Sequence, residues 1–297
     1  YRRRERIGCV KTTPARFLVC VPLARMVHWT MKIPIALTIA GSDSGGGAGI
    51  QADLKAMSAL GVYGASVITA VTAQNTVAVS AVHEMPPDIV AAQISTVLSD
   101  IEIDAIKLGM LFSPAIIAAV ADELAQFSGP VVIDPVMVSK SGDALLQDAA
   151  IDALISQLLP HACLLTPNLP EAARLLNRTE AKSPREMIAQ GRQLLSMGPQ
   201  AVLIKGGHAT GNKCTDVLVQ ADGAVDTFEA PRIVTRNTHG TGCTFSAAIT
   251  AHLAKGQDLA NAVELAHTYL HAAIVGADRL SVGRGHGPVH HFHGYWT

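Results

Sequence analysis

The chain has 297 residues, of which 49% are hydrophobic and 16% charged, and its formal net charge is −1. This length suits one large α/β domain with a well-filled core. Seven Arg and Lys residues fall within residues 1–30 against the single Glu5, so the rest of the chain is acidic. An acidic body argues against nucleic-acid binding, which needs clustered positive charge.

The five cysteines are odd in number and no two stand at metal-ligand spacing, a pattern typical of reduced thiols in the cytoplasm. No run of about 18 apolar residues lacks a charge or a turn signal, so no membrane span is predicted. The basic segment 1–30 begins with Tyr1 and carries no core pattern. We therefore predict an extraneous or disordered leader over residues 1–30 and a single domain over residues 31–297.

Short apolar runs alternate with amphipathic segments from Ile35 onward. Strands are expected at Ala36–Ala40, Ala65–Val71, Ala105–Leu108, Val131–Asp134, Cys163–Thr166 and Ala201–Lys205. Helices are expected at Gln51–Leu60, Pro114–Phe127, Gln147–Leu159 and Pro184–Met197. Buried runs separated by helix-length segments predict an α/β fold with a mostly parallel central sheet and helices on both faces.

The second half of the chain adds a different pattern. Asp216–Pro231, with Asp222-Gly223 as its turn, predicts an antiparallel hairpin at one edge of the sheet. Two long helices should follow, over Cys243–Lys255 and Leu259–Ala277. In such sheets ligands bind beyond the carboxyl ends of the strands, and the polar motifs of this sequence fall at those ends.

The glycine-rich segment NTHGTGCT spans residues 237–244 and leads into a helix of small residues. Gly240 and Gly242 allow successive N–H groups to converge, and the helix adds its positive dipole end, so the segment predicts an anion-binding hole. The alternative is an ordinary helix entry capped by Thr241 or Thr244. The segment lacks the Gly-Lys-Ser/Thr of a Walker A loop.

Cys243 occupies the first turn of this helix, where a thiolate is stabilised and the pKa of the thiol is expected to fall. That would make Cys243 a usable base or nucleophile. The alternative is a small buried residue that only fills space, as many free cysteines do.

Charged and amide side chains follow three of the predicted strands. Asn168 and Glu171 form the sequence pattern of a helix capping box, but Glu171 at a strand end is also a candidate Mg²⁺ ligand, together with Asp134. Lys205 ends a buried strand and needs a partner there, for which phosphate oxygens are suited. Its alternative is a side chain that reaches from the strand end to solvent.

The first two strands end in further candidates. The segment Gly41–Gly49 departs from the dinucleotide-binding pattern and suits a flap or a close backbone approach to a ligand. Asp53, one turn into the next helix, either faces that ligand or is solvated. Gln74 closes the second strand with an amide that donates and accepts side by side, matching an aminopyrimidine edge. A generic polar loop residue is the alternative for Gln74.

Six segments together resemble the bifunctional hydroxymethylpyrimidine/phosphomethylpyrimidine kinases of the ribokinase-like superfamily. They are AGSDSGGGAGIQAD (40–53), AQNT (73–76), KLGM (107–110), TPNLPEA (166–172), KGGH (205–208) and NTHGTGCT (237–244). The resemblance extends from Ile33 to Trp296 and implies the ribokinase-like fold. It also implies ATP-dependent phosphorylation of 4-amino-5-hydroxymethyl-2-methylpyrimidine and of its monophosphate, for thiamine biosynthesis.

The resemblance implies roles for individual residues. The catalytic group would be Gly240, Gly242 and Cys243, with Cys243 in the place where most ribokinase-like enzymes carry an aspartate base. The substrate-binding residues would be Gln74, Asp53, Met110 and Gly41. ATP would contact Lys205, Thr241 and Asn168, and Mg²⁺ would be organised by Glu171 and Asp134. Residues 136–140 match the family's flap only in character.

The rival interpretations are a pyridoxal or pyridoxine kinase on the same scaffold and a non-catalytic, ligand-binding relative. The match of Gln74 and the overall resemblance favour the pyrimidine kinase. As partners we expect the pyrimidine substrate, ATP and a second copy of the chain in a homodimer.

Overall fold

The computed structural model describes residues 32–137, 148–207 and 211–296. The chain divides into two units, Tyr1–Lys32 and Ile33–Thr297, and the fold below belongs to the second. The predicted leader, the flap residues 138–140 and His208 lie outside the described residues.

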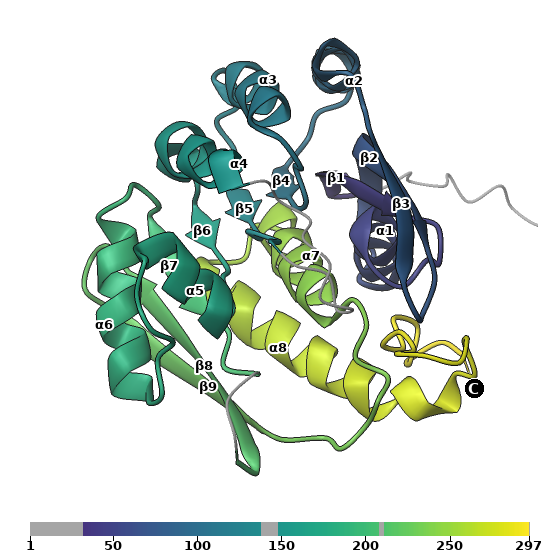
Figure 1. The fold of residues 1–297 in the computed structure, drawn as a ribbon, viewed down its shortest axis with the longest axis vertical. Helices are drawn as coiled ribbons and strands as arrows, with labels where there is room; N and C mark the ends of the chain where they lie inside the picture. Colours follow the sequence, from purple (N-terminus) through teal and green to yellow (C-terminus); the bar gives the residue numbers. More distant parts are fainter. Residues whose placement is uncertain (1–31, 138–147, 208–210, 297) are drawn as a thin grey trace, which may run out of the picture. The chain divides into compact units, whose positions relative to one another are not determined.

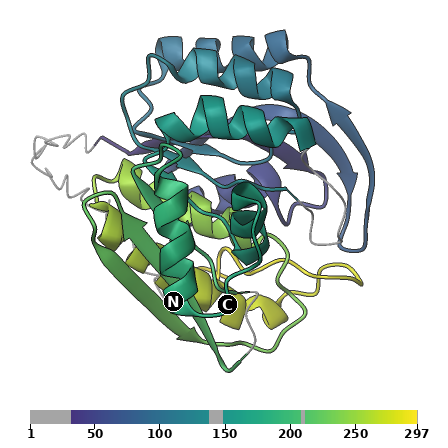
Figure 2. The same ribbon diagram turned by 60° about the vertical axis from the view of Figure 1, so that its left-hand side comes forward.

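A nine-stranded sheet forms the centre of the second unit, in the order β3-β2-β1-β4-β5-β6-β7-β8-β9. Its inner strands are parallel, whereas β3, β8 and β9 pair antiparallel at the edges. The strands are β1 (Ile35–Asp43), β2 (Tyr63–Gln74), β3 (Val79–Glu84), β4 (Ala105–Leu108), β5 (Val131–Ile133), β6 (Leu164–Leu165), β7 (Ala201–Ile204), β8 (Lys213–Gln220) and β9 (Val225–Pro231). All six predicted inner strands and the predicted hairpin are confirmed. Figure 2 shows the two antiparallel pairs, β2–β3 in blue and β8–β9 in green, at opposite edges.

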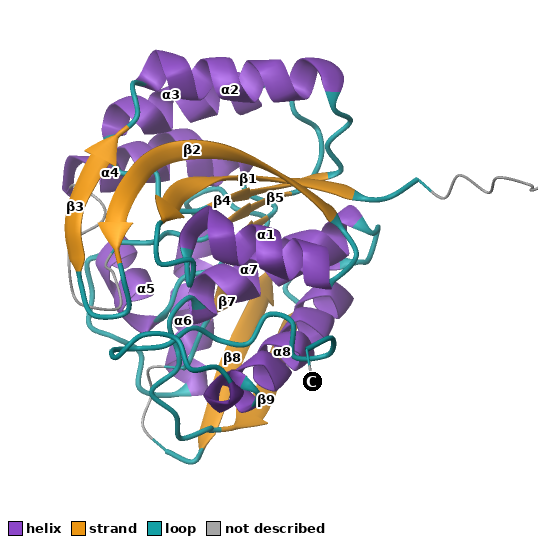
Figure 3. Ribbon diagram, turned by 90° about the vertical axis from the view of Figure 1, so that its right-hand side faces the viewer, coloured by secondary structure: helices purple, strands orange, loops and turns teal. Residues whose placement is uncertain are grey.

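Helices cover both faces of this sheet, as the sequence pattern predicts (Figures 1 and 3). One face carries α2, α3, α4, α5 and α6, and the other carries α1, α7 and α8. The helices are α1 (Gly49–Ala59), α2 (Pro87–Asp100), α3 (Pro114–Leu124), α4 (Asp148–Ala153), α5 (Leu169–Leu176), α6 (Pro184–Leu195), α7 (Thr241–Ala254) and α8 (Leu259–Val275). Among the described residues, no helix is both long and apolar enough to cross a membrane.

The short inner strands are buried on both faces because successive side chains point in opposite directions. In β5, Val131 and Ile133 join the core under α2–α6, while Val132 joins Phe245 and Val263 in the core under α7 and α8. This explains why these strands appear in the sequence as continuous apolar runs rather than as an alternation.

Two regions differ from the sequence expectation. The segment from β3 to α2 was not predicted, because β3 is a half-exposed edge strand and only Val90 and Ile94 of α2 are buried. The helix expected over residues 147–159 is divided: α4 gives way to a π-helical turn at Leu154–Leu158 and a 3-10 turn at Leu159–His161.

Candidate active site

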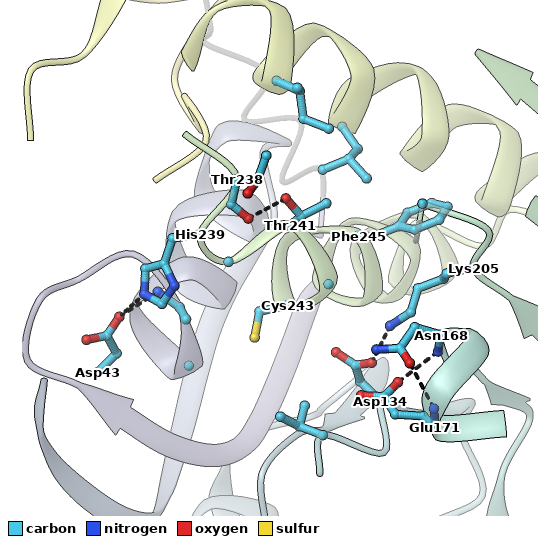
Figure 4. A pocket seen from close by; sticks show the side chains of 18 of the residues that line it. Asp43, Asp134, Asn168, Glu171, Lys205, Thr238, His239, Thr241, Cys243 and Phe245 are labelled. Carbon is cyan, nitrogen blue, oxygen red and sulfur yellow. Dashed lines mark hydrogen bonds and ion pairs between the residues drawn. The ribbon is translucent and has the colours of Figure 1, made fainter. Parts of the chain in front are cut away.

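A cavity of about 390 Å³ lies at the carboxyl ends of the parallel strands, beside the N-terminus of α7. All the residues predicted for the site except Asp53 line it: Gly41, Gln74, Met110, Asp134, Asn168, Glu171, Lys205, Gly240, Thr241, Gly242 and Cys243. Segments distant in the sequence thus meet at one place because each follows a strand of the same sheet. Figure 4 shows this cavity from close by. Cys243 lies between two groups of side chains, Asp43 with His239 on one side and Lys205 with Asp134, Asn168 and Glu171 on the other.

Gly240 sets the entry to α7. Its φ of 77° lies in the left-handed region, and a Cβ there would come within 1.8 Å of the Gly47 carbonyl oxygen. Only glycine allows both the conformation and the close approach of the two glycine-rich loops. The main chain at the start of α7 therefore packs directly against the loop that follows β1.

The N-terminus of α7 has no side-chain cap. Both threonines proposed as alternative caps are engaged elsewhere: the Thr241 hydroxyl donates to the Thr238 carbonyl oxygen (2.7 Å), and Thr244 Oγ1 pairs with His291 Nε2 (3.0 Å). The first α-helical bond runs from the Thr244 N–H to Gly240. The preceding N–H groups of Gly242 and Cys243 are thus directed toward the cavity end of the helix, an arrangement suited to an anion.

The pKa of Cys243 contradicts the sequence expectation. Burial raises the pKa of the thiol to about 11, against the opposing effect of the Lys107 ammonium and with support from the negative charges of Asp53 and Asp134. The helix end alone predicts a lowered pKa, but desolvation and the neighbouring carboxylates outweigh it. In the ligand-free protein the thiol is therefore protonated at neutral pH.

Lys205 and Asp134 form an ion pair at the opposite side of the cavity, with 2.7 Å between Lys205 Nζ and Asp134 Oδ1 (Figure 4). Asp134 also accepts from Ser246 Oγ (3.2 Å) and from Thr166 Oγ1 (3.3 Å). Burial alone would lower the pKa of Lys205, but Asp134 and Glu171 raise it, so the ammonium stays charged. The partner that the sequence predicts for Lys205 is therefore, in this structure, the carboxylate of Asp134.

The capping box predicted at α5 is complete. The Asn168 N–H donates to Glu171 Oε2 (2.8 Å), and the Glu171 N–H donates to Asn168 Oδ1 (2.9 Å). Burial, with the nearby Asp134 carboxylate, nevertheless raises the pKa of Glu171 to about 7 against the attraction of Lys205. A carboxylate used only as a cap would not need to share a buried site with another carboxylate.

Within the described residues, no cluster of three or more His, Cys, Asp or Glu side chains could hold a metal ion. Mg²⁺ does not require one, because it keeps several waters and binds through one or two carboxylates. Two buried carboxylates, Asp134 and Glu171, lie beside the Lys205 ammonium, while the Lys107 ammonium, which also acts on Asp134, is itself bonded to Asp53. Their excess negative charge fits a divalent cation held jointly with substrate phosphates.

The end of the cavity beneath β1 and β2 holds the residues predicted for the substrate. A Cβ at Gly41 would meet Met110 Cε at 2.4 Å, so the two are in contact. Gln74 ends β2 with its amide next to Thr72 and His239. The structure thus brings Gly41, Met110 and Gln74 together.

Asp53 does not belong to this group, and the expectation that it faces the ligand is wrong. Its carboxylate is fully buried and bonds to Lys107 Nζ (2.7 and 2.8 Å) and to Thr38 Oγ1 (2.6 Å). The alternative of a solvated helix carboxylate is wrong as well. Lys107, rather than Asp53, reaches the lining of the cavity.

Sequence reasoning missed the pair of Asp43 and His239. Asp43 accepts the N–H groups of Gly45, Gly47 and Ala48 and lies 2.9 Å from His239 Nε2 (Figure 4). The main chain of His239 in turn bonds to the C-terminal segment, donating to the Gly287 carbonyl and accepting from the Val289 N–H. An Asp two residues before a glycine is a local turn signal, but nothing local points to a partner 196 residues away.

The sequence of this chain is similar to those of known proteins of one family. The family model described as phosphomethylpyrimidine kinase matches residues 43–290. The hydroxymethylpyrimidine/phosphomethylpyrimidine kinase of Rhizobium meliloti is 57% identical over 88% of this chain and 98% of its own length. The Escherichia coli enzyme of the same name is 53% identical over 90% of this chain and its full length.

The chain belongs to the phosphomethylpyrimidine kinase family. Among solved structures, this member of the family is similar to the pyridoxal kinase of Staphylococcus aureus in complex with AMP-PCP and pyridoxal, with a TM-score of 0.81. That match is 34% identical and covers 89% of this chain and 95% of the other. The fold is therefore ribokinase-like, and the higher identity to the pyrimidine kinases favours them over the pyridoxal kinase interpretation.

Proposed function

We propose that this protein transfers the γ-phosphoryl group of ATP to the hydroxymethyl group of 4-amino-5-hydroxymethyl-2-methylpyrimidine, and then to the resulting monophosphate, in thiamine biosynthesis. The observation that carries this proposal is the uncapped N-terminus of α7, which lies between a polar substrate end near Gln74 and the charged group around Lys205. Family membership supports the same reaction.

The cavity has the two ends that such a reaction needs. Apolar side chains of Ile233, Phe245, Leu270 and Ile274 line one side, which suits a purine ring. The phosphates of ATP would contact Lys205, Thr241 and Asn168. The pyrimidine substrate would be held by Gly41, Gln74 and Met110. The phosphoryl group then passes the N–H groups of Gly242 and Cys243, which stabilise the charge that develops during transfer.

Asp134 and Glu171 would hold Mg²⁺ together with the phosphates of ATP. When bound, the metal would neutralise phosphate charge, which is a main requirement of phosphoryl transfer. Both carboxylates must be ionised for this purpose. The Lys205 ammonium favours the ionised state. Once the cation binds Asp134, it would take over part of the ion pair with Lys205, and the lysine could then turn toward phosphate oxygens.

Cys243 would accept the proton of the attacking hydroxyl group in the first transfer. The hydroxyl oxygen forms its bond to the γ-phosphorus, the bond from that phosphorus to the bridging oxygen breaks, and ADP leaves with the electron pair. The hydroxyl proton passes to the thiolate, which becomes a thiol. Because the pKa of Cys243 is raised to about 11, the thiolate is the minority form at neutral pH. The Lys107 ammonium opposes this rise in the pKa of the thiol, so the fraction of thiolate is larger than burial alone would allow.

Mass spectrometry of the products formed from the hydroxymethylpyrimidine, ATP and Mg²⁺ tests the proposal. We expect both the monophosphate and the diphosphate. Pyridoxal in a parallel reaction separates the rival kinase, since preferential phosphorylation of pyridoxal would contradict the assignment. Failure to consume ATP with either alcohol would indicate a non-catalytic ligand-binding relative instead.

We further propose that the protein acts in the cytoplasm as a homodimer without nucleic-acid partners, and that residues 31–297 form its one functional domain. Sedimentation equilibrium of the full chain measures the assembly state directly, and a monomer at micromolar concentration would contradict the homodimer.

A further inference from the structure

The amide of Gln74 lies between two neighbours at the substrate end of the cavity. Its Nε2 atom is 3.4 Å from His239 Nε2, and its Oε1 atom is 3.2 Å from Thr72 Oγ1. An amide's nitrogen and oxygen are distinguished by the donors and acceptors around them. The proton positions on His239 and Thr72 therefore decide which way this amide faces.

His239 Nε2 must carry a proton. It lies 2.9 Å from Asp43 Oδ2, and Asp43 already accepts the N–H groups of Gly45, Gly47 and Ala48. Although burial acts in the opposite direction, these bonds and that of His239 hold the pKa of Asp43 below its ordinary value, so the carboxylate is ionised. A bare ring nitrogen would face this anion with a lone pair, so the tautomer with hydrogen on Nε2 is required.

The hydroxyl of Thr72 is committed in the same way. Its Oγ1 lies 2.9 Å from the Ser42 carbonyl oxygen, which can only accept, so the single hydroxyl hydrogen points there. Thr72 therefore offers Gln74 a lone pair. The one hydrogen on His239 Nε2 is donated to Asp43 Oδ2, so toward Gln74 this nitrogen presents no lone pair and only the weaker arm of a shared N–H. An oxygen toward Thr72 and a nitrogen toward His239 would produce two mismatches, and exchanging the two atoms removes both.

We infer that His239 and Thr72 fix the Gln74 amide with Oε1 toward His239 and Nε2 toward Thr72, and that this fixed orientation makes them specificity-determining residues for a 4-aminopyrimidine over its 4-oxo analogue. One N–H of Gln74 and one lone pair of its oxygen remain for the ligand. The inference rests on the proposed function, because it assumes that Gln74 reads the pyrimidine ring.

The two pyrimidines present opposite edges to this amide. A 4-aminopyrimidine has an exocyclic donor beside a ring-nitrogen acceptor, whereas the 4-oxo form has a carbonyl acceptor beside a ring N–H. The 4-oxo compound cannot bind with its ring flipped to restore the match, because its 5-hydroxymethyl group must reach the N-terminus of α7. An amide that rotates freely would accept either edge, and a fixed amide matches only one.

Two matched pairs of variants test the inference. His239→Leu removes the N–H that binds Asp43, and His239→Gln retains an N–H donor at a similar reach. Thr72→Val removes the hydroxyl, and Thr72→Ser retains it. Thr72 lies in β2, and its hydroxyl bond to Ser42 of the first glycine-rich segment is retained in Thr72→Ser, so this pair reports on the amide even where a change at His239 prevents folding.

The measurement is kcat/KM for 4-amino-5-hydroxymethyl-2-methylpyrimidine and for its 4-oxo analogue with each enzyme. We expect the unmodified protein to prefer the amino compound by about 100-fold or more, because the oxo edge leaves donors and acceptors mispaired. His239→Leu and Thr72→Val should each lower this preference by about tenfold, and His239→Gln and Thr72→Ser should preserve it. The ratio cancels any loss common to both substrates, such as a displaced α7 loop.

Three outcomes would overturn the inference. If Thr72→Val and His239→Leu keep the original preference, the amide does not need these neighbours, although the proposed function stands. If the unmodified protein phosphorylates both pyrimidines equally well, Gln74 does not discriminate between the edges. If it phosphorylates neither, the proposed function fails and the inference fails with it.

Discussion

Lys107 Nζ lies 2.7 and 2.8 Å from the two carboxylate oxygens of Asp53, and both side chains are fully buried, with only Lys107 in the lining of the cavity. Burial alone would lower the pKa of Lys107, but Asp53 reverses this effect and raises it, so the lysine keeps its charge. That charge acts on Cys243, whose pKa Lys107 lowers. Asp53 thus supports the site from outside the cavity.

Removing one charge of this pair should destabilise the fold. Asp53→Asn leaves the Lys107 ammonium buried without its bonded counter-charge, and breaking a buried pair typically costs about 3–5 kcal/mol of the free energy of unfolding. Chemical denaturation measures the change. The double variant Asp53→Asn, Lys107→Met, which removes both charges, should recover most of the stability. If the single and double variants are equally destabilised, the loss does not come from an unpaired charge.

Gln74→Leu should raise the KM for the aminopyrimidine. A buried donor or acceptor left without its partner costs about 1–3 kcal/mol, which corresponds to a KM increase of roughly 5- to 150-fold. The KM for ATP in the same variant is the internal control and should change little, since Gln74 lies at the other end of the cavity. Unchanged affinity for the pyrimidine would remove Gln74 from substrate recognition.

Glu171→Gln separates the two roles of this side chain. Glutamine also serves in a capping box, so the melting temperature should be nearly unchanged. A neutral amide cannot replace a Mg²⁺-organising carboxylate, and the Mg²⁺ concentration for half-maximal activity should rise. Asn168→Ala, which removes the side-chain cap, should instead lower stability by about 1 kcal/mol. Normal Mg²⁺ dependence in Glu171→Gln would leave Glu171 as a cap only.

Cys243→Ala should affect the two phosphorylations unequally. The attacking alcohol needs a base, which typically contributes about 10²–10⁴-fold, whereas a phosphate monoester with a second pKa near ~6 is largely ionised already. Steady-state rates on both substrates from one preparation give the comparison. Cys163→Ala is the matched control because Cys163 precedes β6, away from the carboxyl ends of the strands. Equal losses on both substrates would mean that Cys243 shapes the loop.

The raised pKa of Cys243 predicts a distinctive pH dependence. If the thiolate is the base, its fraction increases about tenfold per pH unit below the pKa of about 11. The rate on the alcohol, divided by the rate on the monophosphate, should therefore rise between pH 7 and pH 9 by roughly tenfold per unit. Ionisation of Glu171, whose pKa is about 7, affects both rates and cancels in the ratio. A flat ratio would exclude the thiolate as the base.

Much of this site could be predicted from the sequence because its residues follow buried strands. The apolar runs that end near Asp134, Asn168 and Lys205 identify one edge of a parallel sheet without reference to tertiary contacts. Local patterns also correctly gave the capping box of α5. These features depend on short-range geometry, which the sequence carries directly.

The remainder depends on contacts between distant segments. The position of Asp53 on α1 does not reveal that Lys107 of β4 will meet it, and a helix N-terminus does not reveal the burial that raises the pKa of Cys243. The pairing of Asp43 with His239 joins two loops whose local patterns are independent. All three features depend on charged groups that folding brings together from distant segments. The periodic patterns of apolar residues in the sequence carry no information about such contacts.

The main-chain bonds between His239 and the segment Gly287–Val289 affect when the site can form during synthesis. A ribosome releases the chain from its N-terminus, so the α7 loop emerges well before the residues that hold His239. Until Gly287 leaves the exit tunnel, His239 has neither of these main-chain partners, and it gains the second only with Val289. The α7 loop therefore gains its full set of these main-chain bonds only after Val289 has left the ribosome, later than all nine strands of the sheet have been synthesised.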